Sequence, residues 1–495
     1  MRRSDHADTR TISDGDVLPV ETDPQAVTAL VLVWSREEPE RVGEVCLVPG
    51  GYSGVTVRMG RAPGMPGDIL PRAEFCRQRP GMVVHTGPLN SMRISRDQLE
   101  ISAERTGLWV RNIGRCPLLH NGNPVQEATI QTGDLLELKG QALIYCAQRP
   151  AALPAFAPGV PTPAPHRFGY ADGLGMVGES LASWALRERI QFVGPRAVHV
   201  LIRGGSGTGK ELVAQAIHQL SSRGRKQMIS RNAATIPESL IDAELFGNAR
   251  NYPNPGMAER AGLVGEADGS TLFLDEFAEI PPAMQAHLLR VLDQGEYHRL
   301  GESKPRRADF RLIAATNRPE SALKEDVLAR LRIRLELPDL NQRREDIPLL
   351  VRHILKRIVA EDSQLTARCF FPDGTLRVSP TLMSSLLTRQ WNTHIRELEA
   401  ILWTAISDSR GDWLEVQLPP SVSAGLPNTV EAESTQRGVD PLTVPAEHIQ
   451  AVLDKHGGRQ EPAWKELGFS SRHVLTRLVR RYGLRVKGRS AEDDD

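Results

Sequence analysis

The chain lacks the features that mark membrane and secreted proteins. Its longest apolar run, VTALVLVW, is far shorter than the roughly 20 apolar residues that a membrane-spanning helix needs. No apolar core follows the arginines of its opening stretch, MRRSDHADTR, as it would in a signal peptide. We therefore expect a cytoplasmic protein with no membrane partner.

An excess of one charge is also missing. The 61 Lys and Arg residues equal the 61 Asp and Glu residues, so no overall field draws the molecule to nucleic acid, and any such contact must be local. The five cysteines form no CxxC pair and no metal-ligand spacing. We interpret them as reduced thiols rather than as disulfides or zinc ligands. They are Cys46, Cys76, Cys116, Cys146 and Cys369.

Two segments without a hydrophobic period divide the 495 residues, which are too many for one ordinary domain. Residues 149–170 are rich in proline and alanine and are expected to form a semi-rigid extended spacer. Residues 416–443 are polar with scattered glycine and proline, and we interpret them as a second linker. The sequence therefore predicts an N-terminal third, a large centre and a short C-terminal module.

The first two parts differ in their hydrophobic pattern. After a disordered N-terminus at 1–24, residues 25–148 carry many short β-rich segments broken by Gly, Pro, Asn and Asp. This pattern predicts an all-β sandwich. The centre alternates strands such as VHVLIRG, STLFLDE and FRLIAAT with helical patterns such as KELVAQAIHQL and MQAHLLRVLDQ. That alternation is typical of an α/β fold with a parallel sheet.

A glycine-rich loop joins the first central strand to the helix after it. VHVLIRG leads into GGSGTGK and then into a helix, the order that a P-loop requires, because glycines let backbone N–H groups surround phosphates. Lys210 would reach the outer phosphates. Glu211 stands where the common pattern has a magnesium-binding Ser or Thr, although Thr208 offers a hydroxyl nearby. The candidate nucleotide-binding residues are Gly204, Gly205, Ser206, Gly207, Thr208, Gly209, Lys210 and Glu211.

Two carboxylates follow the next apolar strand. STLFLDE ends in Asp275 and Glu276, one to hold Mg²⁺, usually through water, and one to polarise the attacking water. The strand FRLIAATN ends in Asn317, which is placed to sense the terminal phosphate. We therefore predict an ATPase that uses ATP and Mg²⁺.

Residues 177–402 resemble the AAA+ domain of bacterial enhancer-binding proteins, the ATPases that remodel sigma-54 RNA polymerase. The resemblance rests on GGSGTGKELVAQAIH, DAELFG, GSTLFLDEFAEIP, LLRVLDQGEYHRLG, FRLIAATN, LELPDLNQRREDIPLL and IRELEAIL, which follow in register. It implies an α/β core at 171–340 and an α-helical lid at 341–415. The roles that it implies are phosphate binding for Lys210, magnesium coordination for Asp275, activation of water for Glu276, control of that glutamate for Asn232, and nucleotide sensing for Asn317 and Arg396.

Members of this family work as ring oligomers, commonly hexamers, because arginines of one subunit complete the site of its neighbour. The family segment of the type FREDLYYRL reads LKEDVLARL here. Arg330 keeps the second arginine, whereas Lys324 replaces the first, and lysine lacks the planar fork that meets phosphate bidentately. We expect ATP binding to be intact and hydrolysis to be slowed.

The C-terminal module at 444–487, ahead of an acidic tail at 488–495, predicts a helix-turn-helix. Two short helices flank a glycine-containing turn, and ten Lys or Arg against two Glu lie between 455 and 489. A solvated basic face is the alternative. The spacing resembles the Fis-type helix-turn-helix that ends most enhancer-binding proteins, which implies binding to upstream DNA. The candidate DNA contacts are Ser471, Arg472, His473, Thr476 and Arg477.

The N-terminal third resembles a forkhead-associated (FHA) domain in MGR, RISRDQLEI, VRNIGRCPLLHNGNPV and TGDLLEL. Such domains bind phosphothreonine peptides, which implies Arg61, Ser95 and Arg96 as phosphate contacts. The pattern departs from the family at Gln98, where a structural histidine is usual, and at Cys116, where a peptide-contacting asparagine is common. A sandwich that has lost its ligand and serves for packing or interaction is the alternative.

The loop that contacts sigma-54 in the family is rewritten in this chain. Family members carry GAFTGA after ELFG, and the corresponding positions 251–256 read NYPNPG. Pro253 replaces the contacting Phe and Pro255 the second Gly, and each proline fixes its own φ and restricts the residue before it. Tyr252 still offers an aromatic contact one position early.

Two functions therefore stay open at this point. The first is an ATP-dependent regulator whose helix-turn-helix binds DNA, whose sandwich receives a phosphorylation signal and whose AAA+ ring acts on sigma-54 holoenzyme. The second is a DNA-tethered, phosphoprotein-binding regulator or repressor that binds ATP but no longer activates the polymerase. A chaperone-like remodeller is disfavoured by the DNA-binding end. We expect ATPase activity to survive and sigma-54-dependent promoter opening to be weak or absent.

Overall fold

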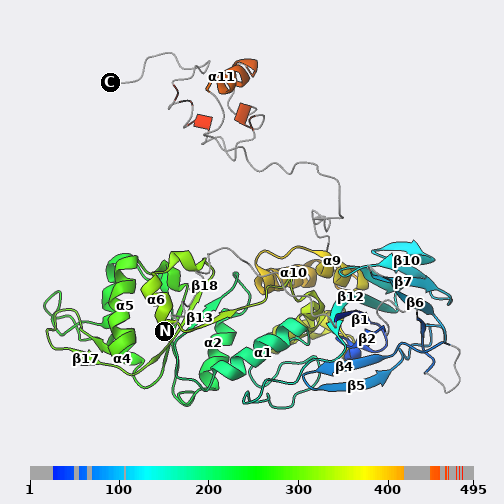
Figure 1. Ribbon diagram of the computed structural model, residues 1–495, viewed down its shortest axis with the longest axis horizontal. Helices are drawn as coiled ribbons and strands as arrows, with labels where there is room; N and C mark the ends of the chain where they lie inside the picture. Colours follow the sequence, from blue (N-terminus) through cyan, green and yellow to red (C-terminus); the bar gives the residue numbers. More distant parts are fainter. Residues whose placement is uncertain are drawn as a thin grey trace, which may run out of the picture. The chain divides into compact units, whose positions relative to one another are not determined.

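The structure is a computed structural model of the chain (Figure 1). It describes residues 26–48, 55–63, 70–104, 107–416 and 446–456, and a few single positions between 463 and 482. The predicted segments 1–24 and 488–495 lie outside the described residues, as does the second linker apart from Val416. The chain divides into two compact units, Met1–Ser421 and Val422–Asp495, and each is described by itself.

The N-terminal third is all-β, as the sequence predicts. Two antiparallel sheets enclose a shared apolar core, and their strand orders are β5-β4-β2-β1-β12-β11-β8-β9 and β10-β7-β6-β3. The strands are β1 (Ala26–Ser35), β2 (Val45–Leu47), β3 (Thr56–Met59), β4 (Phe75–Arg79), β5 (Met82–Gly87), β6 (Leu99–Glu104), β7 (Gly107–Asn112), β8 (Leu118–His120), β9 (Asn123–Val125), β10 (Glu127–Ile130), β11 (Leu135–Leu138) and β12 (Ala142–Pro150).

The long apolar run of β1 has a structural reason. Successive side chains of a strand point to opposite faces, and here both faces are covered. Leu30 and Leu32 belong to the core between the two sheets, whereas Val31 and Val33 belong to a second cluster that also contains lid residues such as Leu386. A strand that is buried on both faces needs apolar residues at nearly every position.

The predicted spacer begins later than the sequence analysis placed it, because β12 continues to Pro150. Residues 151–170 contain no helix or strand, and most of their apolar side chains are exposed. Leu153 and Phe168 are buried, and the Phe168 ring lies under the guanidinium of Arg79 at 5.5 Å. The segment therefore contacts the sandwich through these two residues instead of separating it from the next domain.

The centre of the chain is an α/β domain with a five-stranded parallel sheet of order β14-β15-β18-β13-β19. The strands predicted from VHVLIRG, STLFLDE and FRLIAAT are β13, β15 and β18. The elements are α1 (Leu181–Val193), β13 (Val200–Arg203), α2 (Lys210–Gln219), β14 (Ile229–Asn232), α3 (Ile241–Phe246), α4 (Gly262–Glu266), β15 (Thr271–Asp275), α5 (Pro282–Gln294), β16 (Glu296–Tyr297), β17 (Arg306–Arg307), β18 (Arg311–Thr316), α6 (Glu325–Arg330) and β19 (Ile333–Glu336).

A helical lid follows the sheet and packs against the sandwich. Its buried apolar residues form one cluster with residues of β1, β11 and β12, and the Trp34 indole N–H donates to the Val378 carbonyl at 2.9 Å. The lid helices, yellow and gold in Figure 1, are α7 (Ile347–Glu361), α8 (Thr366–Cys369), α9 (Pro380–Thr388) and α10 (His394–Asp408).

The second unit is described only in part. Its helix α11 (Ala446–Lys455) lies at the start of the module predicted at 444–487. Ile449, Val452 and Leu453 of this helix form a small core with residues further along the chain. These partners are Ala463, Leu467 and Leu475.

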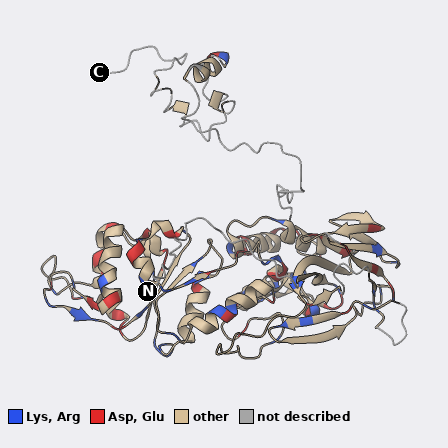
Figure 2. Ribbon diagram, in the orientation of Figure 1, with Lys and Arg blue, Asp and Glu red and all other residues tan. Residues whose placement is uncertain are grey.

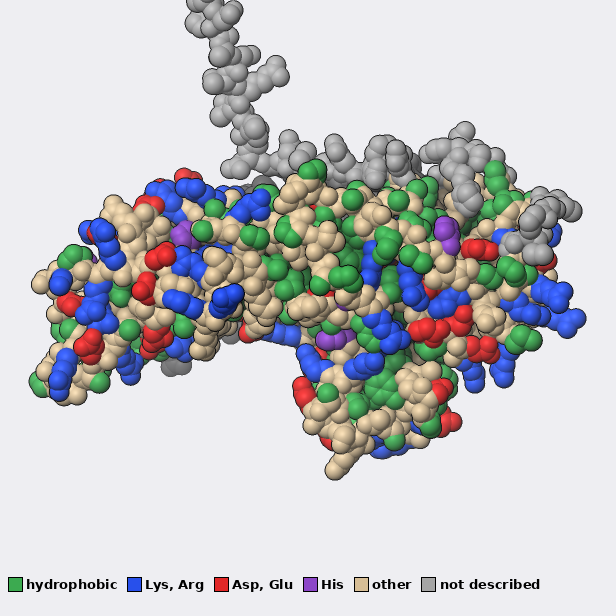
Figure 3. Space-filling model, turned by 90° about the horizontal axis from the view of Figure 1, so that it is seen from below, with side chains coloured by type: hydrophobic (Ala, Val, Ile, Leu, Met, Phe, Trp, Pro, Cys, Tyr) green, Lys and Arg blue, Asp and Glu red, His purple; other side chains and the backbone are tan. Residues whose placement is uncertain are grey.

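Charges of both signs are interspersed over the molecule. Figure 2 and the face shown in Figure 3 have Lys and Arg side chains mixed with Asp and Glu side chains, as a net charge of zero allows. All five cysteines are buried with free thiols. Among the described residues, no helix combines the length and the apolar character that crossing a membrane requires.

Candidate functional site

The glycine-rich loop lies between β13 and α2, at the carboxyl edge of the parallel sheet. Gly207 and Gly209 have φ values of +79° and +102°, in the region that favours glycine. A β-carbon on Gly207 would lie only 2.3 Å from the Thr393 carbonyl oxygen, so no larger residue fits there. The loop thus presents bare backbone N–H groups beside the N-terminus of α2, an arrangement that binds phosphates.

The predicted lysine and carboxylates meet at this edge. Lys210 Nζ donates to the carbonyls of Gly204 and Gly205 at 3.1 and 3.3 Å, and lies 3.8 Å from Glu276 Oε1. Asp275 ends β15, and its Oδ1 accepts the backbone N–H of Glu276 at 2.9 Å. The structure therefore brings together the groups proposed for phosphate, magnesium and water.

Strand register places both predicted asparagines at the same edge. β14 and β15 pair Asn232 with Asp275. The backbone N–H of Gly204 donates to the Thr316 carbonyl at 3.3 Å, so Asn317 follows directly beside the P-loop. Asn232 Oδ1 accepts the Ala234 N–H at 2.9 Å and so caps the turn after β14. A hydrogen bond from Asn232 to Glu276 would require this cap to break.

The first turn of α10 is docked on the P-loop. The Ile395 N–H donates to the Gly207 carbonyl at 3.1 Å, and Arg396 Nη1 donates to Ser206 Oγ at 2.9 Å. The predicted second sensor is therefore in contact with the loop.

Sequence reasoning missed two further lid residues at this contact. Arg343 Nη2 donates to the Thr208 carbonyl at 3.3 Å, and His394 lies against Gly205. Arg343 lies in NQRREDI and His394 directly precedes IRELE, two stretches that carry the family resemblance. Their position in the sequence therefore could have indicated that they lie near the nucleotide site. Burial lowers the pKa of Arg343 and of His394.

These groups fit a nucleotide with a magnesium ion. The glycine backbone, Lys210 and Arg396 supply donors for phosphates. The described residues contain no cluster of three or more His, Cys, Asp or Glu that could hold a metal alone. Asp275 would therefore hold Mg²⁺ together with the phosphates, which is the usual mode for this ion. Glu211 is exposed, and the Thr208 hydroxyl donates to the Gly205 carbonyl at 2.9 Å.

The two cations proposed to act on a neighbouring subunit lie on α6. Arg330 forms a two-point ion pair with Asp293 of α5, with Nη2 and Oδ2 3.0 Å apart. This hydrogen bond lowers the pKa of Asp293. Lys324 is exposed at the start of α6, where its backbone N–H donates to Gln285 Oε1 at 3.0 Å. To reach the nucleotide site of a neighbouring subunit, Arg330 must break its ion pair with Asp293 and bind the phosphates instead.

Comparisons with known proteins agree with this geometry. The family described as "Sigma-54 interaction domain" matches residues 176–340, and the "AAA+ ATPase lid domain" matches residues 341–435. The chain is 38% identical over 318 residues to the transcriptional regulatory protein ZraR of Escherichia coli K12, which covers 63% of this chain and 69% of that protein. The chain belongs to the family of sigma-54-dependent transcriptional regulators.

Two further relatives of this regulator are the formate hydrogenlyase transcriptional activator of Salmonella typhimurium and NtrX from Brucella abortus. The first is 35% identical over 316 residues, covering 62% of the regulator and 44% of the activator. The crystal structure of the second, in complex with ATP, matches at 30% identity with a TM-score of 0.43, covering 62% and 69% of the two chains. By its family the regulator is an AAA+ ATPase, and membership implies an interaction with sigma-54 RNA polymerase and oligomerisation.

The rewritten positions 251–256 lie in a compact turn of the regulator, which we call the tip loop (residues 248–260). Its ends pair through reciprocal backbone bonds between Asn248 and Arg260. The buried Asn248 amide donates to three carbonyls of the loop, those of Ala249, Tyr252 and Ala258, at 3.0 to 3.2 Å. The tip loop is therefore closed upon itself.

A second loop, residues 296–307, is joined to the tip loop. The Ala249 N–H donates to the Leu300 carbonyl at 2.9 Å, and the Arg299 guanidinium forms an ion pair with Glu259. The Tyr252 ring covers Gly301 so closely that a β-carbon there would lie 2.4 Å from it. Tyr252 is nevertheless 42% exposed, so the two loops form one body with an aromatic residue at its surface.

The three candidate phosphopeptide residues gather at one end of the sandwich. The Arg61 N–H donates to the Ser95 carbonyl at 3.1 Å, and the Ala62 N–H donates to the Arg96 carbonyl at 3.3 Å. The Ser95 hydroxyl accepts the Arg115 N–H at 2.9 Å. Arg96 is exposed and Arg61 is half-buried. These hydrogen bonds place the backbones of Arg61, Ser95 and Arg96 close together.

The Gln98 side chain connects these loops through hydrogen bonds. Its buried amide oxygen accepts the Ser95 N–H at 3.0 Å. Its Nε2 donates to Asn112 Oδ1 at 2.7 Å and to the Cys116 carbonyl at 2.9 Å. Gln98 therefore fills the bracing role for which the family resemblance names a histidine. Cys116 is buried and contributes its backbone carbonyl to this brace.

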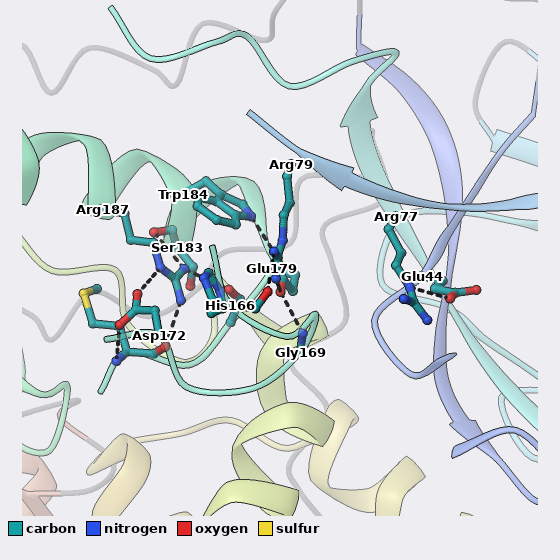
Figure 4. Close-up of polar contacts among 12 residues, drawn as sticks. Glu44, Arg77, Arg79, His166, Gly169, Asp172, Glu179, Ser183, Trp184 and Arg187 are labelled. Atoms are coloured by element: carbon teal, nitrogen blue, oxygen red, sulfur yellow. Dashed lines mark hydrogen bonds and ion pairs between the residues drawn. The ribbon is translucent and has the colours of Figure 1, made fainter. Parts of the chain in front are cut away.

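The sandwich and the ATPase domain share a buried polar contact, which we call the Glu179 junction (Figure 4). Glu179 is 2% exposed and receives a two-point ion pair from Arg79 of β4, at 2.8 and 3.3 Å. It also accepts the Gly169 N–H at 2.7 Å and the Trp184 indole N–H at 3.1 Å. One carboxylate therefore joins the sandwich, the spacer and α1.

Two further contacts extend from this junction to the lid. Asp346 accepts the backbone N–H of Glu179 at 2.7 Å and the Ser183 hydroxyl at 2.6 Å. Arg149 of β12 forms an ion pair with Glu345 at 3.1 Å, and burial raises the pKa of Glu345 despite this partner. The sandwich is thus tied to both the α/β core and the lid.

Most of the predicted DNA contacts lie outside the described residues. Ser471, Arg472, His473 and Arg477 are not described. Thr476 is helical and partly buried next to Leu475, a member of the small core. DNA binding by this module stays a prediction.

Proposed function

We propose that the regulator is a DNA-binding ATPase of the enhancer-binding type in which a phosphopeptide-binding sandwich controls an AAA+ ring. The observation that carries this proposal is that Lys210, Asp275 and Glu276 lie together at one edge of the sheet. Arg396 of the lid contacts the P-loop at the same place. The Glu179 junction supports the control by the sandwich, because it connects that domain directly to the ATPase.

The side chains divide the hydrolytic work as follows. Lys210 and the loop N–H groups bind phosphate oxygens. Asp275 holds Mg²⁺, which neutralises charge on the phosphates when it is bound. Glu276 accepts a proton from the attacking water. Arg330 of a neighbouring subunit would stabilise the developing charge, with Lys324 as a weaker second cation because ammonium lacks the planar fork.

The sandwich would bind phosphothreonine through Arg61, Ser95 and Arg96. Titration of the full-length chain with phosphothreonine peptides tests this, and the matched unphosphorylated peptides serve as the control. Arg61→Ala should weaken binding by tenfold or more, since it removes a charge-assisted contact to a dianion. If the native chain binds no phosphopeptide from a degenerate library, the sandwich has only a packing role.

A second function is favoured by the closed tip loop. A repressor or scaffold needs the ATPase and DNA-binding parts but no loop that engages sigma-54. Closure by Asn248 and the prolines at 253 and 255 both oppose the extended loop that an activator uses.

A reconstituted promoter-opening assay separates the two functions. Sigma-54 holoenzyme on a premelted promoter is incubated with the regulator and ATP, and opening is compared with and without nucleotide. We expect weak or absent ATP-driven opening by a protein that still hydrolyses ATP. Robust opening would establish the activator and remove the repressor.

A further inference from the structure

His394 begins α10 at the place where the lid meets the P-loop. Its φ is +48°, a left-handed conformation that is uncommon for residues other than glycine. The side chain is 6% exposed. A β-carbon on Gly205 would lie 2.7 Å from His394 Nε2, so the imidazole occupies the space directly beside the phosphate-binding loop.

The imidazole has an unused polar atom. His394 Nδ1 is buried and forms no hydrogen bond in the described part of the chain, although buried polar atoms in proteins nearly always have a partner. The neighbouring lid residue Arg343 donates to the Thr208 carbonyl but keeps its buried Nε without a partner. Two lid side chains in contact with the P-loop thus retain polar atoms without partners.

The ring can supply a hydrogen-bond donor. Burial lowers the pKa of His394, and Arg343 and Lys210 lower it further, whereas Asp339 and Glu397 raise it. A neutral imidazole carries one N–H donor and one acceptor. Its tautomer can therefore adapt to an oxygen that arrives beside Gly205.

We propose that His394 is a nucleotide-contacting residue of the lid, whose Nε2–H, on the side of the ring next to Gly205, donates to the phosphate chain of bound ATP or ADP. This contact would add to that of Arg396, which reaches Ser206 two residues along the same turn. It also gives the left-handed backbone of His394 a function, because strained conformations persist where a site requires them. The competing explanation is that the ring only fills space between lid and loop.

Two variants of the full-length chain distinguish these explanations. His394→Gly removes the ring, and His394→Asn replaces it with a shorter donor. Glycine and asparagine both tolerate positive φ, so neither adds backbone strain. His353→Ala, at a half-buried histidine of α7 whose charged neighbour is Arg357, is the matched control.

The primary measurement is the Kd for ADP and for a non-hydrolysable ATP analogue, by calorimetry. We expect His394→Gly to raise both Kd values about five- to tenfold, the effect of losing one buried hydrogen bond. His394→Asn should recover at least half of that loss on a logarithmic scale, and His353→Ala should bind as the wild type. Glycine and asparagine variants that both bind within twofold of the wild type would overturn the proposal, whatever their thermal stability.

A measurement on the wild-type chain makes the proposal independent of variant folding. Exchange of the histidine C2 hydrogen, followed by mass spectrometry, reports the surroundings of each imidazole. Saturating ADP should slow exchange at His394 at least twofold and leave His353 unchanged. Equal exchange at His394 with and without ADP would mean that the ring does not meet the nucleotide.

Discussion

At the scale of single residues, positive φ values mark three candidate functional positions of the ATPase domain. In the described part of the chain four residues other than glycine adopt them: Asn121, Asn251, Glu276 and His394. Glu276 lies against Lys210, His394 lies against Gly205, and Asn251 lies in the tip loop. Such conformations cost free energy and persist where the surroundings fix them. At Glu276 the turn directs the carboxylate back toward Lys210.

The assignment of Glu276 as the group that activates water is tested by Glu276→Gln. The amide keeps the size of the side chain but cannot accept a proton, so we expect the ATPase rate to fall at least a hundredfold. The Kd for ADP should stay within threefold, because Lys210 and the loop N–H groups remain. A steady-state phosphate-release assay with parallel calorimetry measures both quantities. Unchanged turnover would show that another residue activates the water.

The Glu179 junction is the decisive contact at the scale of elements. Arg79→Ala leaves the Glu179 carboxylate buried without its cation, and breaking a buried ion pair in this way costs about 3 kcal/mol or more. We expect the first thermal transition of the full chain to fall and the spacer to become sensitive to proteolysis. Arg111→Ala, which removes an arginine with a half-exposed side chain from the pair with Glu100, should have little effect.

A double-mutant cycle decides whether the contact itself matters. Glu179→Gln in the Arg79→Ala background should restore part of the stability, because it removes the unpaired buried charge. If the two substitutions act additively, the junction is not a coupled unit. A change of ATPase rate that accompanies the loss of stability would link the sandwich to the nucleotide site.

Elements whose signals are local were predictable, whereas their docking was not. The P-loop, the strand ending in Asp275 and the β-rich character of the N-terminal third follow from short stretches of sequence. The Glu179 junction joins residues 100 positions apart, and the Trp34 bond to Val378 spans 344 positions. The sequence around Arg79 or Trp34 does not indicate which distant residue each will contact. The same holds for the tip loop, where composition showed the change but not its closure by Asn248.

The proposed ring is the relevant object at the scale of the whole molecule. Arg330→Ala and Lys210→Ala should each abolish ATPase activity, the first by removing the cation given to a neighbour and the second by disabling the subunit's own loop. Mixed in equal amounts, the two variants can form sites with an intact Lys210 in one subunit and an intact Arg330 in the next. We therefore expect partial recovery of activity in the mixture.

The control for this experiment mixes Lys210→Ala with Glu276→Gln. The mixture of Lys210→Ala with Glu276→Gln leaves no complete site, because both changes lie on the same side of the subunit contact, and it should stay inactive. Phosphate release at several mixing ratios measures the recovery. No recovery from Arg330→Ala with Lys210→Ala at any ratio would show that Arg330 serves its own subunit.

The strand β1 limits how the N-terminal sandwich can be exchanged for another domain. Its alternate side chains belong to two different cores, one within the sandwich and one shared with the lid. A homologous sandwich exchanged into this position would therefore have to match the lid of its new host as well as its own second sheet. Substitutions on the lid-facing side of β1 would therefore have to be matched by changes in the lid.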